Sequence, residues 1–303
     1  MRRFLVAAIA AAWLGSVPGA ATALDILMTN DDGFSAIGIQ TLAAALRGAG
    51  HDVTVVAPFG ERSGSSAKID LAPVNPVQVG AQDWALIALD EDIDGERVPI
   101  PAHPATCVLF GLTVTLDGED PDLVVSGTNV GANVGTATSF SGTVGGVTAG
   151  LAGGVPSIAF SSDGPDVPET DPAFAAHFEN VAAFAVELIA LLESKPGALA
   201  NEPGLLPDGI ALNVNYPTVA PEDVAGAKLT VQGQASSASL IYVEIAPGVF
   251  VPSVGPGSGD EADVKDSDTV AVEEGYIAIT PITNDRTAGS SWSKLESVIT
   301  SFD

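Results

Sequence analysis

The sequence contains a single cysteine, Cys107, and only three histidines, His51, His103 and His177. One cysteine cannot form an internal disulfide or build a cysteine-rich zinc site. The histidines also lack the HExxH spacing of many zinc hydrolases. Any metal ion must therefore be held mainly by oxygen ligands, which favours magnesium, manganese or calcium over zinc or copper.

Basic residues are scarce as well. The sequence contains 11 lysines and arginines and 38 aspartates and glutamates, so the formal net charge is −27 at pH 7. A nucleic-acid polymer is bound through a basic face, so we expect no DNA or RNA partner. The acidic excess favours hydration and solubility. A small anionic substrate remains compatible with this chain if a bound cation inverts the local charge.

Long apolar runs without charge, glycine or proline occur only near the N-terminus. Two arginines at positions 2 and 3 precede an apolar run at 4–17, two helix breakers and the triplet Ala21-Thr22-Ala23. This order is typical of a secretory signal peptide cut after Ala23, and the run is too short for a stable membrane span. An uncleaved anchor is the alternative. We expect residues 1–23 to be a signal peptide and the mature protein to be periplasmic or secreted, without membrane contact.

The mature chain, 24–303, is long enough for one large domain with a substantial core. Strand and helix patterns alternate through its first two-thirds: buried strands are expected at 25–29, 53–57, 122–126 and 157–160, and helices from Ile39 to Gly48 or Gly50, at 104–116, from about Gly142, and at 171–194. Repeated strand–helix units predict an α/β fold with a mostly parallel sheet between helical layers.

The last third has a different pattern. Strands are expected at 229–231, 240–245, 269–272 and 276–280, without strong helices between them. We interpret about 229–280 as a β-rich extension of the same domain. Exposed strand edges tend to be paired, so this extension is expected to serve self-association.

Polar loops follow three of the expected strands. The first carries Asp31 and Asp32, the second Ser63, and the third Asn129 and Asn133. Loops at the carboxyl ends of parallel strands open at one edge of the sheet, so these can converge on one site. Adjacent carboxylates repel unless a proton or a cation lies between them, and oxygen ligands suit a hard cation with an oxyanion.

Each of these features has an ordinary alternative. Asn30-Asp31-Asp32-Gly33 is also good turn chemistry before a helix, and the loop after Arg62 can be merely solvated. The glycines and asparagines at 127–135 also suit tight turns. Ser141-Gly142-Thr143 resembles a helix start with free N–H groups for a phosphate, but ordinary capping explains it too. His103, before Pro104, has no partner near it in the sequence and is expected to be a loop residue and not a ligand.

Together, these segments resemble the signatures of the SurE family (survival protein E). The matching segments are TNDDG at 29–33, VAP at 56–58 with RSG at 62–64, VVSGTNVGANVG at 124–135, SGTV at 141–144, LNVNYP at 212–217 and EGYIAITP at 274–281. The match follows one order along nearly the whole mature chain. The resemblance implies a three-layer, Rossmann-like fold, a homodimer or homotetramer, and metal-dependent hydrolysis of nucleoside monophosphates.

By this resemblance one divalent cation per subunit, Mg²⁺ or Mn²⁺ with Ca²⁺ as the alternative, is held by four ligands. These are Asp31, Asp32, Ser63 and Asn129. Either aspartate is the candidate catalytic base toward a water. The remaining phosphate oxygens of the substrate, a small phosphate ester, are expected to contact Asn133, Ser141, Gly142 and Thr143.

The chain departs from the family pattern at three places. Ala102–Cys107 reads AHPATC where the family usually has GTPxDC, Phe140 replaces a frequent tyrosine, and Gly33–Gly38 is less polar than usual. The first departure leaves a second interpretation open, an exported binding protein that keeps the metal and phosphate pocket without turnover. A phosphatase for another small ester, such as a sugar phosphate or polyphosphate, is a third.

Overall fold

The structure, a computed structural model, describes residues 23–91, 95–194, 205–235, 238–256 and 263–287. All but the last residue of the expected signal peptide therefore lies outside the described residues.

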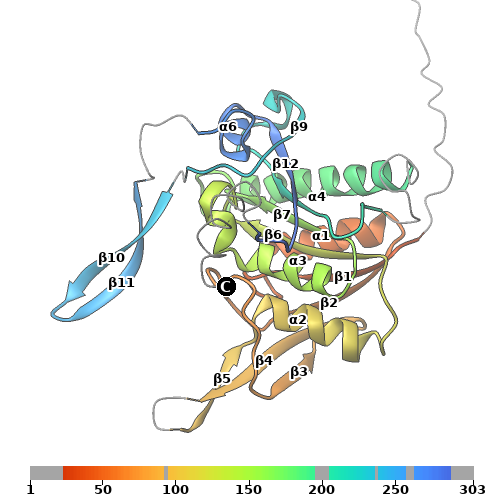
Figure 1. Ribbon diagram of the computed structural model, residues 1–303, viewed down its shortest axis with the longest axis vertical. Helices are drawn as coiled ribbons and strands as arrows, with labels where there is room; N and C mark the ends of the chain where they lie inside the picture. The colour runs from red at the N-terminus through yellow and green to blue at the C-terminus, as the bar shows by residue number, and fades with distance from the viewer. Residues whose placement is uncertain (1–22, 92–94, 195–204, 236–237, 257–262, 288–303) are drawn as a thin grey trace, which may run out of the picture.

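A ten-stranded sheet forms the centre of the fold (Figure 1). Its strand order is β3-β4-β2-β1-β6-β7-β8-β12-β9, and β5 pairs with β4. The strands from β4 to β8 in this order run parallel, whereas β3, β5 and β12 run antiparallel to a neighbour. The bounds are β1 Asp25–Thr29, β2 Asp52–Pro58, β3 Val74–Gln78, β4 Asp83–Glu91, β5 Arg97–Pro101, β6 Leu123–Val130, β7 Ser157–Ser162, β8 Ala211–Asn215, β9 Ala227–Leu229 and β12 Ile277–Ile282.

Helices cover both faces of this sheet. Alternate residues of β1 point to opposite faces, as a strand requires. Ile26 and Met28 pack with α1 (Ile37–Gly48) and α4 (Pro172–Glu193), whereas Leu27 packs with α2 (Pro104–Phe110) and α3 (Gly142–Ala152). The predicted α/β fold, with helical layers on a mostly parallel sheet, is confirmed.

Helix α4 is, in the described part of the chain, the one helix long and apolar enough to cross a membrane. It belongs to the core: one of its faces, which includes Phe178, Val181, Ala185 and Ile189, is buried. Its length and composition are those of a helix that covers a sheet.

The predicted buried strands and the helices of the first two-thirds are present as β1, β2, β6, β7 and α1 to α4, and a π-helical turn at Gly111–Thr115 continues α2. Sequence reasoning missed β3, β4, β5, β8 and β11, of which β4 and β8 lie inside the main sheet and β3 and β5 at its edge. β3 and β5 are largely exposed and contain prolines, which sheets tolerate only at their edges. Such strands lack the apolar run that marks a central strand.

The expected strand at 269–272 is wrong. These residues form α6 (Asp268–Glu273), whose N-cap Ser267 accepts a hydrogen bond from the Val270 N–H. A capping serine followed by an acidic residue in the first turn stabilises a helix. These local contacts outweigh the strand preference of Thr269-Val270-Ala271-Val272.

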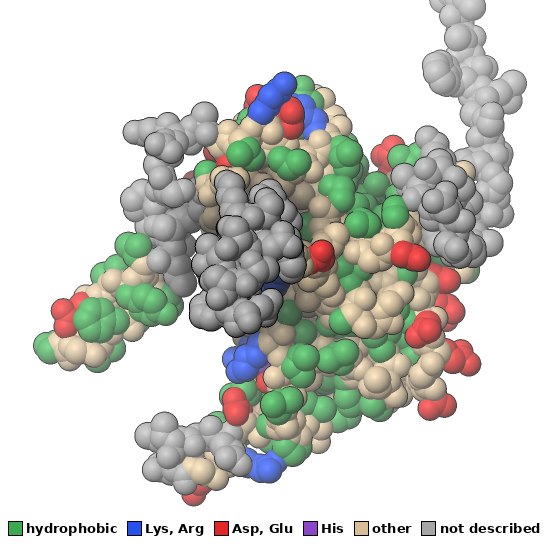
Figure 2. All heavy atoms as spheres, viewed as in Figure 1, with side chains coloured by type: hydrophobic (Ala, Val, Ile, Leu, Met, Phe, Trp, Pro, Cys, Tyr) green, Lys and Arg blue, Asp and Glu red, His purple; other side chains and the backbone are tan. Residues whose placement is uncertain are grey.

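The C-terminal third is also less separate than expected. β9 and β12 join the main sheet, and only β10 (Ala238–Ala246) and β11 (Val249–Pro256) form a hairpin of their own. The hairpin projects from the body (Figure 1), and its surface is largely hydrophobic (Figure 2). Its exposed large apolar side chains are Ile241, Tyr242, Val243, Ile245, Val249 and Phe250. Self-association through this hairpin stays a prediction.

Candidate active site

Three loops meet at the carboxyl edge of the sheet, after β1, β2 and β6. The Arg62 N–H, in the loop after β2, donates to the Asp31 backbone oxygen at 2.7 Å. The Val130 N–H, at the end of β6, donates to Asp32 Oδ2 at 3.2 Å. The structure thus brings the predicted loops together around Asp31 and Asp32, as the parallel order of their strands requires.

The two aspartates form a buried carboxylate pair. Asp31 is 2% exposed and Asp32 is half-buried. Burial raises the pKa of Asp31, although the Thr143 hydrogen bond opposes this shift. Burial and the charge of Asp31 raise the pKa of Asp32 to about 7. Among the described residues neither aspartate has an ion pair with lysine or arginine. The pair therefore lacks the positive charge that would stabilise its ionised form.

The ligand set fits a hard cation. Asn129 is 6% exposed, and its Nδ2 donates to the Gly131 oxygen at 2.7 Å while its Oδ1 is buried without a hydrogen-bond partner. An amide oxygen fixed in this way is a natural ligand for Mg²⁺, Mn²⁺ or Ca²⁺. Ser63 lies at the exposed tip of its loop, and its N–H donates a hydrogen bond to Glu61 Oε1. No cluster of three Asp, Glu, His or Cys side chains suited to a metal occurs in the described ranges, so a metal ion bound here would need amide and hydroxyl ligands beside the two aspartates.

Thr143, predicted to contact phosphate, binds the carboxylate pair in this structure. Its Oγ1 donates to Asp31 Oδ1 at 2.5 Å and accepts from Asn133 Nδ2 at 3.3 Å. Asn133 Nδ2 also donates to Ser161 Oγ at 2.9 Å. A chain of buried polar groups therefore fixes the orientation of Asp31, and such outer partners commonly tune a metal site.

Two asparagines of β8 complete this network, and sequence reasoning gave them no role. Asn215 Oδ1 accepts from the Asn133 N–H at 2.7 Å, and Asn213 Nδ2 donates to the Asn133 oxygen at 2.8 Å. Both side chains are fully buried. The sequence Leu212-Asn213-Val214-Asn215 contains the sign of this role. Polar residues two positions apart in an apolar strand lie on the same face, so the two asparagines could have been predicted to act together.

The N-terminus of α3 lies directly against Asp31. A Cβ on Gly142 would lie 2.8 Å from Asp31 Oδ2 and 2.7 Å from Ser65 Oγ, so the close approach requires glycine. Ser141 caps the helix, since its Oγ accepts from the Val144 N–H at 3.1 Å. The hydroxyls of Ser141 and Thr143 and the amide nitrogen of Asn133 thus bind protein groups. Phosphate contact by Asn133 and residues 141–143 stays a prediction.

His103 has a partner that is distant in the sequence. Its Nδ1 lies 2.6 Å from Asp70 Oδ1, and both side chains are buried. The two residues are 33 positions apart, so the sequence gave no local sign of the pair. His103 precedes α2 in a loop, as predicted.

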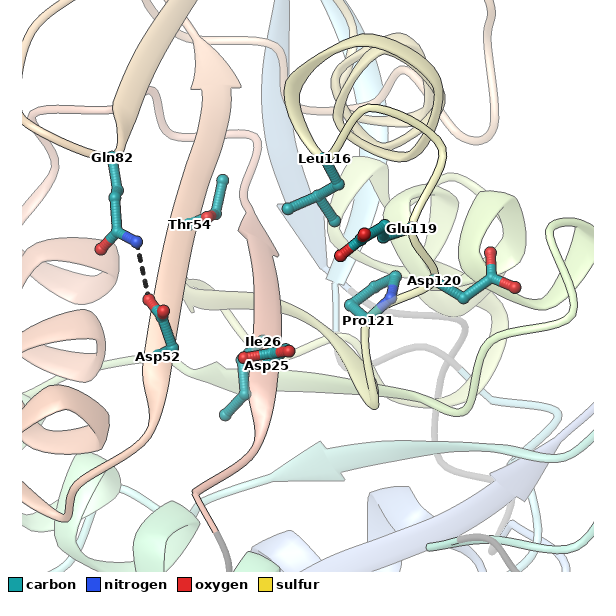
Figure 3. Close-up of a pocket in the computed structure, with 9 residues that line it drawn as sticks. All are labelled: Asp25, Ile26, Asp52, Thr54, Gln82, Leu116, Glu119, Asp120 and Pro121. Carbon is teal, nitrogen blue, oxygen red and sulfur yellow. Dashed lines mark hydrogen bonds between the residues drawn. The ribbon is translucent and has the colours of Figure 1, made fainter.

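A second acidic cluster lines a pocket of about 170 Å³ at the opposite edge of the sheet (Figure 3). Asp25 and Asp52 begin β1 and β2 there, and Gln82 donates to Asp52 at 2.7 Å. Glu119 and Asp120 lie on its other side (Figure 3). This pocket is distant from Asp31 and Asp32, which follow the other end of β1.

Comparison with known proteins identifies the family. The family model described as "Survival protein SurE" matches residues 26–239. A protein of Xanthomonas campestris pv. campestris (strain B100) named 5'-nucleotidase SurE is 38% identical over 264 residues, which cover 86% of this chain and 90% of that protein. A protein of the same name from Trichormus variabilis is 35% identical over 289 residues, with coverages of 90% and 97%.

A solved structure agrees. The crystal structure of the SurE protein from Aquifex aeolicus superposes with a TM-score of 0.70 at 28% identity, covering 90% of this chain and 98% of that one. Of the segments that carry the sequence resemblance, those at 29–33, 62–64, 124–135 and 141–144 supply the loops and the helix start around the carboxylate pair, whereas those at 212–217 and 274–281 lie mainly on β8 and β12. This chain belongs to the SurE family.

Proposed function

We propose that this protein is a divalent-metal-dependent phosphomonoesterase that hydrolyses nucleoside 5'-monophosphates to nucleoside and phosphate. Family membership and relatives named 5'-nucleotidase SurE support phosphate-ester hydrolysis. The observation that carries the metal dependence is the Asp31–Asp32 carboxylate pair, one buried and one half-buried, which has no ion pair with lysine or arginine among the described residues. Asn129 precedes Val130, whose N–H donates to Asp32 Oδ2, and the Asn129 Oδ1 is buried without a hydrogen-bond partner. An anionic ester can approach such a pair only when a cation is bound.

The residues have separate parts in this proposal. Asp31, Asp32, Ser63 and Asn129 would hold one Mg²⁺ or Mn²⁺, which when bound supplies a Lewis acid for a phosphate oxygen. Thr143 holds Asp31 through one carboxylate oxygen, and the Val130 N–H holds Asp32. An aspartate of the pair accepts the proton of the attacking water. The Gly142 N–H, at the positive end of α3, would donate to a phosphate oxygen.

A phosphate-release assay tests the proposal. Purified protein is supplied with several nucleoside 5'-monophosphates, a sugar phosphate, polyphosphate and an aryl phosphate, each with Mg²⁺, with Mn²⁺ and after exhaustive chelation. We expect turnover of the nucleotides, loss on chelation and recovery with added metal. Full activity after chelation would refute the metal dependence, and binding of a nucleotide without turnover would favour the exported binding protein.

Location and assembly are part of the proposal. The segment before Leu24 has the order of a signal peptide, so we expect an exported protein that begins at or near Leu24. The exposed apolar hairpin supports a homo-oligomer of two or four chains. Intact-mass measurement of the exported protein and light scattering test the two statements. A retained Met1, or a monomer at micromolar concentration, would refute the corresponding one.

A further inference from the structure

A buried histidine–carboxylate pair lies outside the set of residues that the proposed reaction uses. The side chains of His103 and Asp70 are 6% and 3% exposed. Asp70 Oδ1 lies 2.6 Å from His103 Nδ1, and Asp70 Oδ2 accepts from the His103 N–H at 2.8 Å. One histidine therefore binds both oxygens of one carboxylate, an arrangement that fixes direction as well as distance.

Two further features stabilise this arrangement. The Asp70 N–H donates to Thr106 Oγ1 at 2.7 Å, so Asp70 is held by main chain and side chain. His103 precedes Pro104, and a residue before proline is restricted to extended backbone. Its φ of −85° and ψ of 151° are those of such a conformation. We call Asp70, His103 and Thr106 the clamp.

The clamp holds one end of the loop that carries Ser63. Nearer the carboxylate pair, the Arg62 N–H binds the Asp31 oxygen and Arg62 Nε binds the Pro101 oxygen, each a direct hydrogen bond. The Ser66 N–H donates to the Phe140 oxygen at 3.0 Å, beside α3. Between these contacts the loop tip at Ser63-Gly64 is exposed. The position of the tip therefore depends on anchors at its two sides.

We propose that Asp70, His103 and Thr106 are positioning residues that hold the 61–70 loop against α2 and so set the metal affinity of the site. The inference rests on the proposed function, because it takes Ser63 as a metal ligand. Without the clamp, residues 67–70 gain conformational freedom that metal binding must remove. A loop that is ordered beforehand binds its ligand more tightly than one that must be ordered.

The test is direct Mn²⁺ titration by calorimetry on the whole mature protein, with initial rates on a nucleoside monophosphate. His103→Ala removes the side-chain donor to Asp70 and should weaken Mn²⁺ affinity about 10-fold, the lower end of what outer partners contribute. His103→Asn keeps a donor near the position of Nδ1 and should restore most of the affinity. At saturating Mn²⁺ the kcat of His103→Ala should return close to that of the wild type, which general damage to the fold would prevent.

His51→Ala is the matched control. His51 is also buried, and its Nδ1 accepts from the Leu24 N–H at 3.2 Å, at the opposite edge of the sheet. This variant should lose stability and keep the wild-type Mn²⁺ affinity. If His103→Ala does not fold, Thr106→Val replaces it, because it removes the hydroxyl that accepts from the Asp70 N–H and that also contacts the Asp70 side chain, and it should weaken Mn²⁺ binding several-fold.

The outcomes separate the two claims. A wild-type protein that binds no Mn²⁺ refutes the proposed metal site. A wild-type protein that binds Mn²⁺, together with His103→Ala or Thr106→Val of unchanged affinity, overturns the clamp and leaves the proposed function standing. Equal loss in His103→Ala and His51→Ala also overturns it, since the effect would then follow from stability alone.

Discussion

Replacing Thr143 by valine tests the most specific contact at the carboxylate pair. Thr143 is fully buried, and its hydroxyl donates to Asp31 Oδ1 at 2.5 Å. Valine has nearly the shape of threonine, so the change leaves little cavity and removes mainly the hydroxyl. We expect Asp31 to lose its fixed orientation while the fold persists.

The magnitude follows from the charge of the acceptor. A hydrogen bond to an ionised group contributes about 1.5–3 kcal/mol, and about 1.4 kcal/mol is a tenfold change in an equilibrium constant. Mn²⁺ affinity and kcat/KM at limiting Mn²⁺ should therefore fall about 10- to 100-fold, which is also the usual effect of an outer partner of a metal ligand. Asn133 Nδ2 keeps its bond to Ser161, so the loss of stability should stay near the low end of about 1–3 kcal/mol.

Helix α3 provides a matched control for this experiment. Thr148 lies on the same helix, and its hydroxyl donates to the Val144 oxygen at 3.0 Å, away from Asp31. Thr148→Val should leave Mn²⁺ affinity and kcat/KM unchanged. Both variants are compared with the wild type by Mn²⁺ titration, initial rates at several Mn²⁺ concentrations and thermal unfolding. Equal Mn²⁺ affinity in Thr143→Val and Thr148→Val would refute the assignment of Thr143 to Asp31.

Three further predictions follow from the same structure. Asp31→Asn or Asp32→Asn should reduce turnover at least about 10²-fold. Each change should also raise the melting temperature of the metal-free protein, because it removes a carboxylate that lacks a basic partner. Near-normal turnover at limiting metal would show that the replaced aspartate is not part of the site. Folding raises the pKa of Asp32 from its ordinary 3.8 to about 7, so this carboxyl favours the folded state when protonated. The stability of metal-free protein should therefore fall as pH rises from about 4 to about 7, and less so in Asp32→Asn, as thermal unfolding in chelator would show. Tyr242→Asp or Phe250→Asp, on the exposed hairpin, should convert the oligomer into folded monomers in light scattering, and an unchanged mass would rule out the hairpin as the contact.

The general position of the site could be predicted from the sequence because it depends on topology. Buried strands at 25–29, 53–57 and 122–126 are short apolar runs, and parallel order alone brings their carboxyl ends to one edge. Asp31, Asp32 and Asn129 directly follow or end these strands, so little freedom separates their position in sequence from their position in space. The comparisons with SurE proteins confirm the family but do not test these roles.

The partners of those residues could not be predicted in the same way. Asp70 and His103 meet across 33 residues, and Thr143 meets Asp31 across 112, through contacts that only the packed chain defines. The strand expected at 269–272 failed for a local reason, because β-branched residues favour strands until a cap such as Ser267 decides otherwise. The edge strands β3 and β5 could not be recognised in the sequence, because exposed residues and prolines interrupt the apolar pattern that marks a strand.

The local charge adds an argument against a pocket that binds phosphate esters without a cation. Burial is the main cause of the raised pKa of Asp31 and of Asp32, and nearby negative charge adds to it: Glu61 for Asp31, and Asp31, Glu61 and Glu169 for Asp32. The surroundings of the pair are therefore acidic. A phosphate group there would be repelled, and the repulsion is stronger in a partly buried site than in water. Arg62 is the basic residue adjacent to Glu61 in the sequence, and its Nε donates to the Pro101 backbone oxygen. A pocket for phosphate esters without a cation would need basic side chains in place of these acids, so the carboxylates favour a site in which substrate and cation bind together.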